Sequence, residues 1–100
     1  YTLAIQTDKQ GKHIRGSKTF IEGRSEIYLT VEECQEIVDK FSCKGMILYT
    51  GSGEWNHKEQ IKTDKLIGCA VNQEGKRTDT HWATIHYSKA GTHIVPREEK

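Results

Sequence analysis

The chain has 100 residues, 34% of them hydrophobic and 29% charged, and this composition predicts one compact soluble domain spanning residues 1–100. Its formal net charge of +1 falls short of the strong basic excess that marks many nucleic-acid binders. No segment approaches the roughly 18 consecutive apolar residues that a membrane-spanning helix requires. The chain opens on Tyr1 rather than Met and carries no recognisable signal peptide, so we expect a piece of a longer protein or a processed form.

The N-terminal part of the chain is polar and irregular, and it predicts a helical turn or loop near residues 8–13 followed by a long connection. The first regular element that we expect is a helix over Val31–Phe41. Thr30 is a suitable N-cap, and Glu33 three residues later completes a capping box. Apolar residues recur at helical spacing on one face of this segment, so that face is expected to pack on the rest of the domain.

Beyond this helix, short strand-like runs alternate with turn residues. Residues 46–49 are apolar and precede a Gly-Ser-Gly turn, and residues 59–63 fit a short strand or a loop. Residues 65–72 predict a buried strand that ends in a turn. The run 78–88 alternates with period two, and a tight connection then leads to a final strand over 92–95.

The alternation in this C-terminal part separates two faces. Ala83, Ile85 and Tyr87 lie on an apolar face, and the opposite face carries Trp82, Thr84, His86 and Ser88. Pro96 is expected to end the final strand. The predicted fold class is α+β, with a helical and irregular N-terminal segment and one main helix packed on an antiparallel sheet of about four strands.

Two groups of residues suggest chemistry. His86 and His93 lie on strands joined by a short turn, although alternation does not decide whether both face the same side. Lys9, Lys12 and His13 can share one side of a short helix. Imidazoles, ammonium groups and hydroxyls suit phosphodiester cleavage without a metal. The simpler interpretations are a solvated sheet face and a flexible basic segment.

Other chemistries have less support. His86 and His93 with His13 or His81 could hold zinc, but no H-x-x-x-H pair is present. The three cysteines lack C-x-x-C spacing and fall in apolar patterns, which predicts free, partly buried thiols; one pair could still form a disulfide. No P-loop, G-x-G-x-x-G or G-x-S-x-G motif occurs.

Two motifs carry a family resemblance: KQGKHIRG at residues 9–16 and IHYSKAGTHIVP at residues 85–96. With the middle segments SEIYLTVEECQEIVDKF and DKLIGCAVN, the chain from about residue 9 to residue 97 resembles the bacterial polymorphic toxin type fifty domain. That family is placed in the barnase/EndoU/colicin/RelE-like (BECR) group of ribonuclease toxins. The resemblance implies a helical part packed on a four-stranded antiparallel sheet.

The resemblance also implies a function. Such domains form the C-terminal tip of larger proteins that are secreted or contact-delivered from a bacterium, and they act in the target-cell cytoplasm. It implies RNA cleavage, of tRNA for instance, without a metal or other cofactor, by attack of the ribose 2′-OH. The products are a 2′,3′-cyclic phosphate and a 5′-OH. A cognate immunity protein would neutralise the domain, which is expected to be a monomer when free.

Carried over by motif position, the catalytic residues are His13, Lys12, His86, Ser88, His93 and Thr92. His13 would be the general base or acid, one strand histidine its complement, and Lys12 would stabilise the phosphorane. Ser88 and Thr92 would hold phosphate oxygens. The substrate-binding residues are Lys9, Arg15 and Lys89, which would steer the backbone, with Thr84 and Trp82. Trp82 or Tyr87 could stack on a base, although core packing is the expectation for Tyr87.

The charge distribution agrees with an RNA substrate. Residues 1–25 carry five basic and two acidic side chains, and residues 75–97 carry four and one. Residues 26–74 carry five basic and nine acidic side chains. Both motifs therefore lie in basic blocks, which predicts a local basic cleft and an immunity protein with an acidic docking face. The alternatives are a non-catalytic RNA-binding module and a ParE-like toxin that attacks a protein target.

Overall fold

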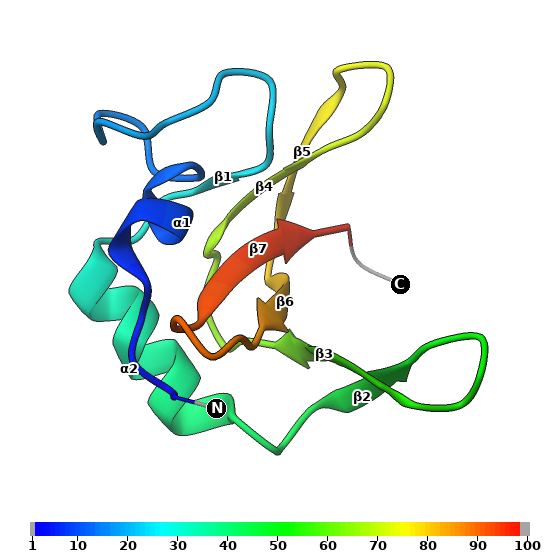
Figure 1. The fold of residues 1–100 in the computed structure, drawn as a ribbon. Helices are drawn as coiled ribbons and strands as arrows, with labels where there is room; N and C mark the ends of the chain where they lie inside the picture. Colours follow the sequence, from blue (N-terminus) through cyan, green and yellow to red (C-terminus); the bar gives the residue numbers. More distant parts are fainter. Residues whose placement is uncertain (1, 99–100) are drawn as a thin grey trace.

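The computed structural model describes residues 2–98, and within that range it has two helices and two antiparallel sheets (Figure 1). This arrangement confirms the α+β class. The elements in chain order are α1 (Thr7–Gly11), β1 (Glu26–Ile27), α2 (Val31–Phe41), β2 (Met46–Tyr49), β3 (Trp55–Lys62), β4 (Gly68–Val71), β5 (Arg77–Thr80), β6 (Trp82–His86) and β7 (His93–Arg97).

The helix α2 has the predicted bounds and the predicted cap. The Thr30 hydroxyl accepts a hydrogen bond from the Glu33 backbone N–H at 3.2 Å, and the Glu33 carboxylate accepts from the Thr30 backbone N–H at 3.1 Å. These reciprocal bonds satisfy backbone donors that the first turn leaves unpaired. The buried face of the helix carries Cys34, Ile37 and Val38, which pack in the core.

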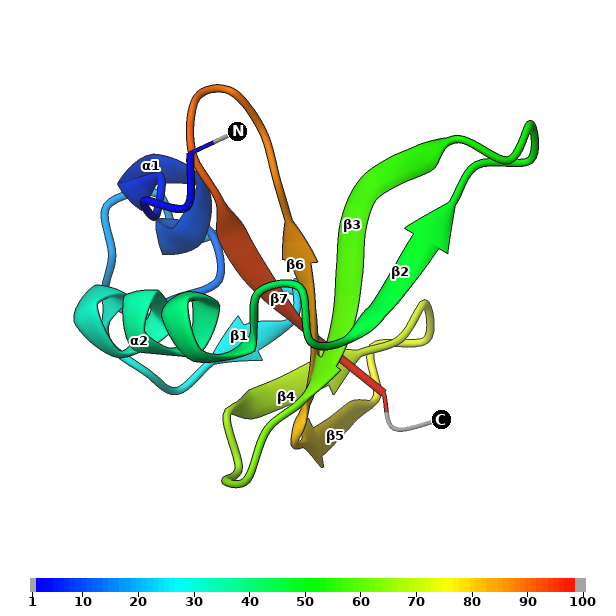
Figure 2. The ribbon, with the colours of Figure 1, turned by 90° about the horizontal axis from the view of Figure 1, so that it is seen from below.

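The larger sheet has the strand order β2-β3-β6-β7, and all its pairs are antiparallel. Both helices lie on one side of it, as Figure 2 shows. On that side Ile61, Ala83, Ile85 and Ile94 are buried at 2% exposure or less and form the core with α2. Tyr87 also belongs to this core, as expected, and its hydroxyl donates to the Glu59 carboxylate at 2.7 Å.

A second sheet, with strand order β1-β4-β5, is an addition to the prediction. The run 78–88, predicted as one strand, divides at His81, so that β5 pairs with β4 while β6 joins the larger sheet. The His81 carbonyl accepts from the backbone N–H and the hydroxyl of Thr63, at 2.8 and 2.9 Å. These bonds fix the point where the chain passes from one sheet to the other.

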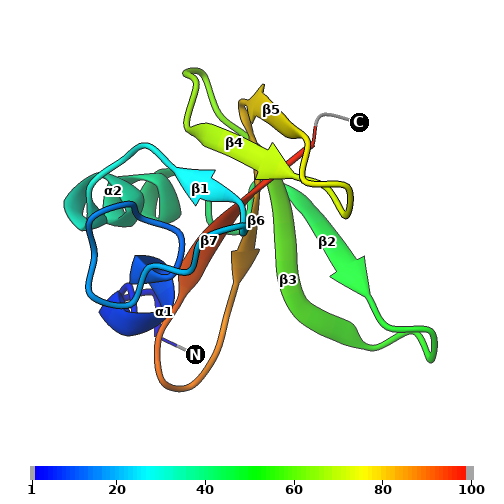
Figure 3. The ribbon, with the colours of Figure 1, turned by 90° about the horizontal axis from the view of Figure 1, so that it is seen from above.

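The expectation that Pro96 ends the last strand is wrong. Pro96 lies inside β7, opposite Ala83 on β6. It is tolerated there because β7 is an edge strand of the larger sheet, where a missing N–H breaks no second ladder. The N-terminal segment runs alongside this edge (Figure 3), and a parallel bridge joins Ile5 to Thr92.

All three cysteines are free thiols, which agrees with the sequence. Cys34 and Cys69 are buried, whereas Cys43 is exposed and corrects the expectation that all three would be partly buried. Burial raises the pKa of the Cys34 thiol to about 12, with Glu33 and Glu32 adding to the shift. That thiol is therefore protonated at neutral pH and unsuited to act as a nucleophile.

Candidate active site

Three histidines lie in a row on the outer side of β6 and β7. His86 and His93 are directly opposite each other in the β6–β7 register, so both face the same side of the sheet. Their rings stack with centroids 4.7 Å apart, and the His13 ring lies parallel to His93 with centroids 6.1 Å apart. We call His13, His93 and His86 the histidine row. It unites the two motifs, whose nearest histidines, His13 and His86, are 73 positions apart in the sequence.

The Gln10 side chain places His13 beside the sheet. This amide is completely buried; its Nε2 donates to the Ile94 carbonyl at 3.0 Å, and its Oε1 accepts from the Ile94 N–H at 2.8 Å. The side chain thus pairs with the open edge of β7 as another strand would. His13 follows Gln10 by one helical turn, so the same bonds fix its position. Sequence reasoning missed Gln10, because one glutamine in a polar segment carries no signal of burial.

The surroundings of His13 select one tautomer. Its Nδ1 lies 2.7 Å from the Ser25 carbonyl oxygen, which can only accept, so we assign the ring proton to Nδ1. Burial lowers the pKa of His13; the Ser25 carbonyl opposes this shift, while Arg24, Arg97 and Lys12 add to it. At neutral pH the ring is therefore uncharged, and its Nε2 has a free lone pair that can accept a proton.

The other two imidazoles also have lowered pKa values. Burial lowers the pKa of His86 to about 3, and repulsion from His93, Lys58 and Arg97 contributes. Burial lowers the pKa of His93 to about 4, with further repulsion from His13, Lys9 and Lys12. An anion bound among these cations would oppose the repulsion and raise both pKa values.

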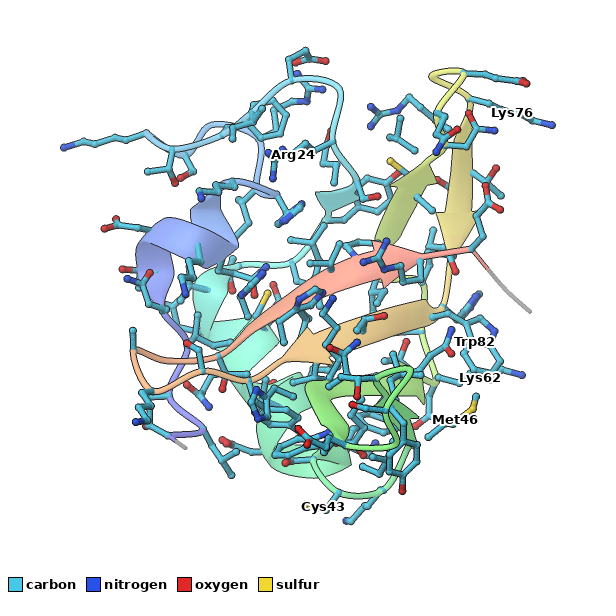
Figure 4. The ribbon with its side chains drawn as sticks, turned by 45° about the vertical axis from the view of Figure 1, so that its right-hand side comes forward. Arg24, Cys43, Met46, Lys62, Lys76 and Trp82 are labelled. Carbon is cyan, nitrogen blue, oxygen red and sulfur yellow. The ribbon has the colours of Figure 1, made fainter. Side chains whose placement is uncertain are left out.

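A polar face extends from the histidine row across the larger sheet. In the strand register, Lys58 lies opposite His86, Gln60 opposite Thr84, and Lys62 opposite Trp82. A groove of about 590 Å³ lies on this face. The β2–β3 and β4–β5 hairpins, which Figure 4 shows on either side of β6 and β7, both contribute to its lining. Its lining residues are Ser25, Leu48, Asn56, Lys58, Gln60, Ala70, Val71, Asn72, Gln73, Thr84, Pro96, Arg97 and Glu98.

Two predicted catalytic hydroxyls make bonds within the chain. Thr92 is completely buried, and its hydroxyl donates to the Thr2 carbonyl at 2.8 Å. The Ser88 hydroxyl donates to the Gly91 carbonyl at 2.6 Å and closes the turn between β6 and β7. Both side chains therefore support the strand connection that sets His86 opposite His93.

The predicted substrate-binding residues fall in different surroundings. Arg15 pairs with Glu22 at 3.2 Å and with Glu26 at 3.0 Å, and its guanidinium covers the Phe20 ring at 4.8 Å. Its charge is thus neutralised locally. The remaining predicted residues differ in position. Lys9 and Lys12 lie close enough to His93 to lower its pKa, in addition to the effect of burial. Lys89 is exposed in the β6–β7 turn, Thr84 lines the groove, and Trp82 lies beside Lys62.

The two remaining histidines lie outside the row. His57 packs edge-on against Trp55, and the exposed His81 joins β5 to β6. Within residues 2–98, no group of three or more His, Cys, Asp or Glu side chains is arranged to hold a metal ion. Nor does that part of the chain contain a helix with the length and apolar character needed to cross a bilayer.

The fold and the site define a small α+β domain that presents three imidazoles and a group of cations on one sheet face. The family model for bacterial toxin 50 (Ntox50) matches residues 5–96, so the chain belongs to this family of bacterial toxin domains. A search of curated proteins finds no match. Membership indicates a secreted or contact-delivered toxin, and toxin domains generally pair with immunity proteins.

Proposed function

We propose that this toxin domain is a metal-independent endoribonuclease of the BECR type. In the proposed reaction the ribose 2′-OH attacks the adjacent phosphorus, and the bond from phosphorus to the 5′-oxygen breaks. The products are a 2′,3′-cyclic phosphate and a 5′-OH. The observation that carries the proposal is the His13 ring, whose Nδ1 contacts the Ser25 carbonyl while its Nε2 makes no hydrogen bond within residues 2–98 and can accept a proton.

His13 is the proposed general base. As the 2′-oxygen bonds to phosphorus, its proton passes to Nε2 of His13. A base for this step needs to be neutral before the reaction and close to the substrate. The lowered pKa of His13 meets the first condition, and its place at the end of the histidine row beside Lys12 meets the second for a phosphate held there.

His93 is the proposed general acid that gives a proton to the leaving 5′-oxygen. Its ring lies between those of His13 and His86. The pKa of His86 is lowered further than that of His93, to about 3 against about 4, so His86 is the harder of the two rings to protonate. His86 is accordingly a positioning residue. The negative phosphate opposes the repulsion that lowers the pKa of His93, so substrate binding favours the protonated acid.

Lys12 and Lys9 would stabilise the charge that develops on the phosphorane, because both lie close enough to shift the pKa of His93. Lys58, Arg97 and the exposed Lys89 would attract the RNA backbone. The proposal gives structural roles to Ser88, Thr92 and Arg15, whose polar groups are already bonded within the chain. A cognate immunity protein would place acidic side chains against the same cations and block the site in the target-cell cytoplasm.

The test is incubation of the purified domain with total RNA in EDTA, followed by mapping of the fragment ends. We expect fragments with 2′,3′-cyclic phosphate and 5′-OH termini. Expression without an inhibitor should also arrest growth. RNA that stays intact but is bound in a strongly salt-dependent manner would instead support a non-catalytic RNA-binding toxin. Intact RNA together with a stable protein complex would support a ParE-like toxin.

A further inference from the structure

The groove beside the histidine row contains a buried amide with an unsatisfied oxygen. Gln60 is only 4% exposed, and its Oε1 has no hydrogen-bond partner in the described part of the chain. Buried polar atoms in folded proteins are nearly always paired, so an unpaired oxygen on a residue that borders a groove calls for a partner from outside the described chain. Rotating the amide by half a turn exchanges oxygen and nitrogen, and the same position then presents a donor.

The position of the groove connects this amide to the proposed chemistry. Lys58 and Arg97 line the groove, and the same two cations lower the pKa of His86 at the end of the histidine row. Gln60 and Lys58 point to the same side of β3, because they are two residues apart on one strand. If a phosphate of the RNA binds at the histidine row, the nucleotide next to it would therefore lie over the groove.

The lining of the groove suits a nucleobase. Its volume of about 590 Å³ is in the range of small-ligand pockets. Asn56 and Thr84 line the same groove as Gln60, and amide side chains bind base edges through paired donors and acceptors. Asn72 is less suitable, because its Oδ1 already accepts from the backbone N–H groups of Glu74 and Lys76 at 2.9 Å each.

We propose that this groove is the base-recognition pocket of the domain and that Gln60 is its specificity-determining residue, reading the edge of the base next to the phosphate at the histidine row. The proposal rests on the proposed function only for the statement that this phosphate is the one cleaved. It predicts that the protein distinguishes between nucleobases even when no bond is broken.

Binding of the four 3′-nucleoside monophosphates and of inorganic phosphate, measured by calorimetry, tests this. The wild-type domain should prefer one base over the weakest by about tenfold or more, the discrimination expected of a bidentate amide contact. Gln60→Leu should reduce the preference to about twofold or less while inorganic phosphate binds as before. Gln60→Glu, which has the same shape but no NH₂ group, should change which base is preferred.

Gln35 provides the matched control, because it lies on α2, outside the lining of the groove, and Gln35→Leu should leave the base preference unchanged. Circular dichroism checks that each variant is folded. Equal binding of all four nucleotides by the wild-type domain, no binding of any of them, or an unchanged preference in folded Gln60→Leu would each overturn the proposal. A domain that prefers one base but leaves RNA intact would uphold the base pocket and refute the nuclease. Cleavage after every base, together with equal binding of all four nucleotides, would refute the base pocket and uphold the nuclease.

Discussion

Two groups of cations in this domain meet opposite electrostatic surroundings. Arg15 and Arg77 both donate to the Glu26 carboxylate, at 3.0 and 2.9 Å, and Arg15 also pairs with Glu22. The second group surrounds the histidine row, and none of its members takes part in an ion pair within residues 2–98. Its members are Lys9, Lys12, Lys58 and Arg97.

This difference separates cations that hold the fold together from cations that are available to an anion. Burial works to raise the pKa of Glu26, but its hydrogen bonds with Arg15 and Arg77 outweigh that effect, so the net pKa is lowered and the carboxylate stays charged. The second group has no such carboxylate, and its repulsion instead adds to burial in lowering the pKa values of the histidines. The site is therefore electrostatically incomplete until an anion binds.

We expect the largest effect from removing the proposed general base, which lies in the histidine row beside the second group of cations. His13→Ala should lower the cleavage rate by about 100-fold or more, the usual contribution of a general base. The measurement is the initial rate of RNA cleavage at saturating RNA. His81→Ala is the matched control, because His81 is exposed and lies outside the row. Equal rates for a folded His13→Ala protein and the wild type would refute the assignment.

Gln10→Leu tests whether the open edge of β7 holds the site together. The substitution leaves the N–H and C=O of Ile94 without their partners, and we expect a loss of about 2–4 kcal/mol in the free energy of unfolding. Urea unfolding gives this value. Cleavage should also fall in the folded fraction, since His13 is then less well positioned. A variant with wild-type stability and rate would show that the amide is dispensable.

The lowered pKa values predict a loss of stability in mild acid. His86 and His93 titrate at about 3 and about 4 in the folded domain, below the ordinary histidine value of 6.5. As pH falls through 6.5 the unfolded chain takes up protons that the folded chain does not, so the folded state loses stability. After allowance for solvent screening we expect a loss of about 1–3 kcal/mol between about pH 7 and pH 4.5.

Urea unfolding at a series of pH values measures this loss. His93→Gln should flatten the profile, because it removes one titrating ring and its repulsion of His86. Added phosphate should do the same in the wild-type protein by compensating the cations of the row. A stability profile that is flat over this pH range in the wild type would contradict the electrostatic description of the site.

We expect the smallest effect when one cation is removed from each of the two groups, the one paired with Glu26 and the one around the histidine row. Lys12→Gln should weaken RNA binding and reduce the slope of log K against log salt concentration by about 1, since one phosphate contact is lost. Arg77→Gln should leave the slope unchanged, because its charge is already balanced by Glu26. Filter binding at several salt concentrations measures both slopes. Equal slopes for the two variants would remove the distinction between the groups.

Local features of the fold were predictable from the sequence, and long-range ones were not. Helix α2 follows from apolar spacing and from a capping box within four residues, so its bounds were predicted correctly. The division of residues 78–88 between two sheets depends on Thr63, far away in the sequence, which binds the His81 carbonyl. Period-two alternation continues through this point and gives no sign of the change of sheet.

In the candidate site, too, local features were predictable from the sequence and long-range ones were not. The motifs supplied the histidines, but the register that sets His86 opposite His93 depends on the turn closed by Ser88 and Gly91. Gly91 has a φ of 133°, and a Cβ there would lie 2.8 Å from Gln6 Cβ, so this position requires glycine. The sequence pattern does not indicate the role of Gln10, because that role depends on hydrogen bonds to the edge of β7, which is far away in the sequence. A motif also does not show whether a hydroxyl is bonded within the chain, as the Thr92 hydroxyl is to the Thr2 carbonyl.

The pairing of Gln10 with Ile94 has a consequence for the order in which the domain becomes active. The two residues are 84 positions apart, and they lie near opposite ends of the described chain. A ribosome that has synthesised everything up to β6 has therefore produced His13 without the strand against which it is placed. The three imidazoles meet only after β7 has been added, so the proposed catalytic centre cannot form before residues 93–97 have been synthesised. A polypeptide released before that point is expected to be harmless.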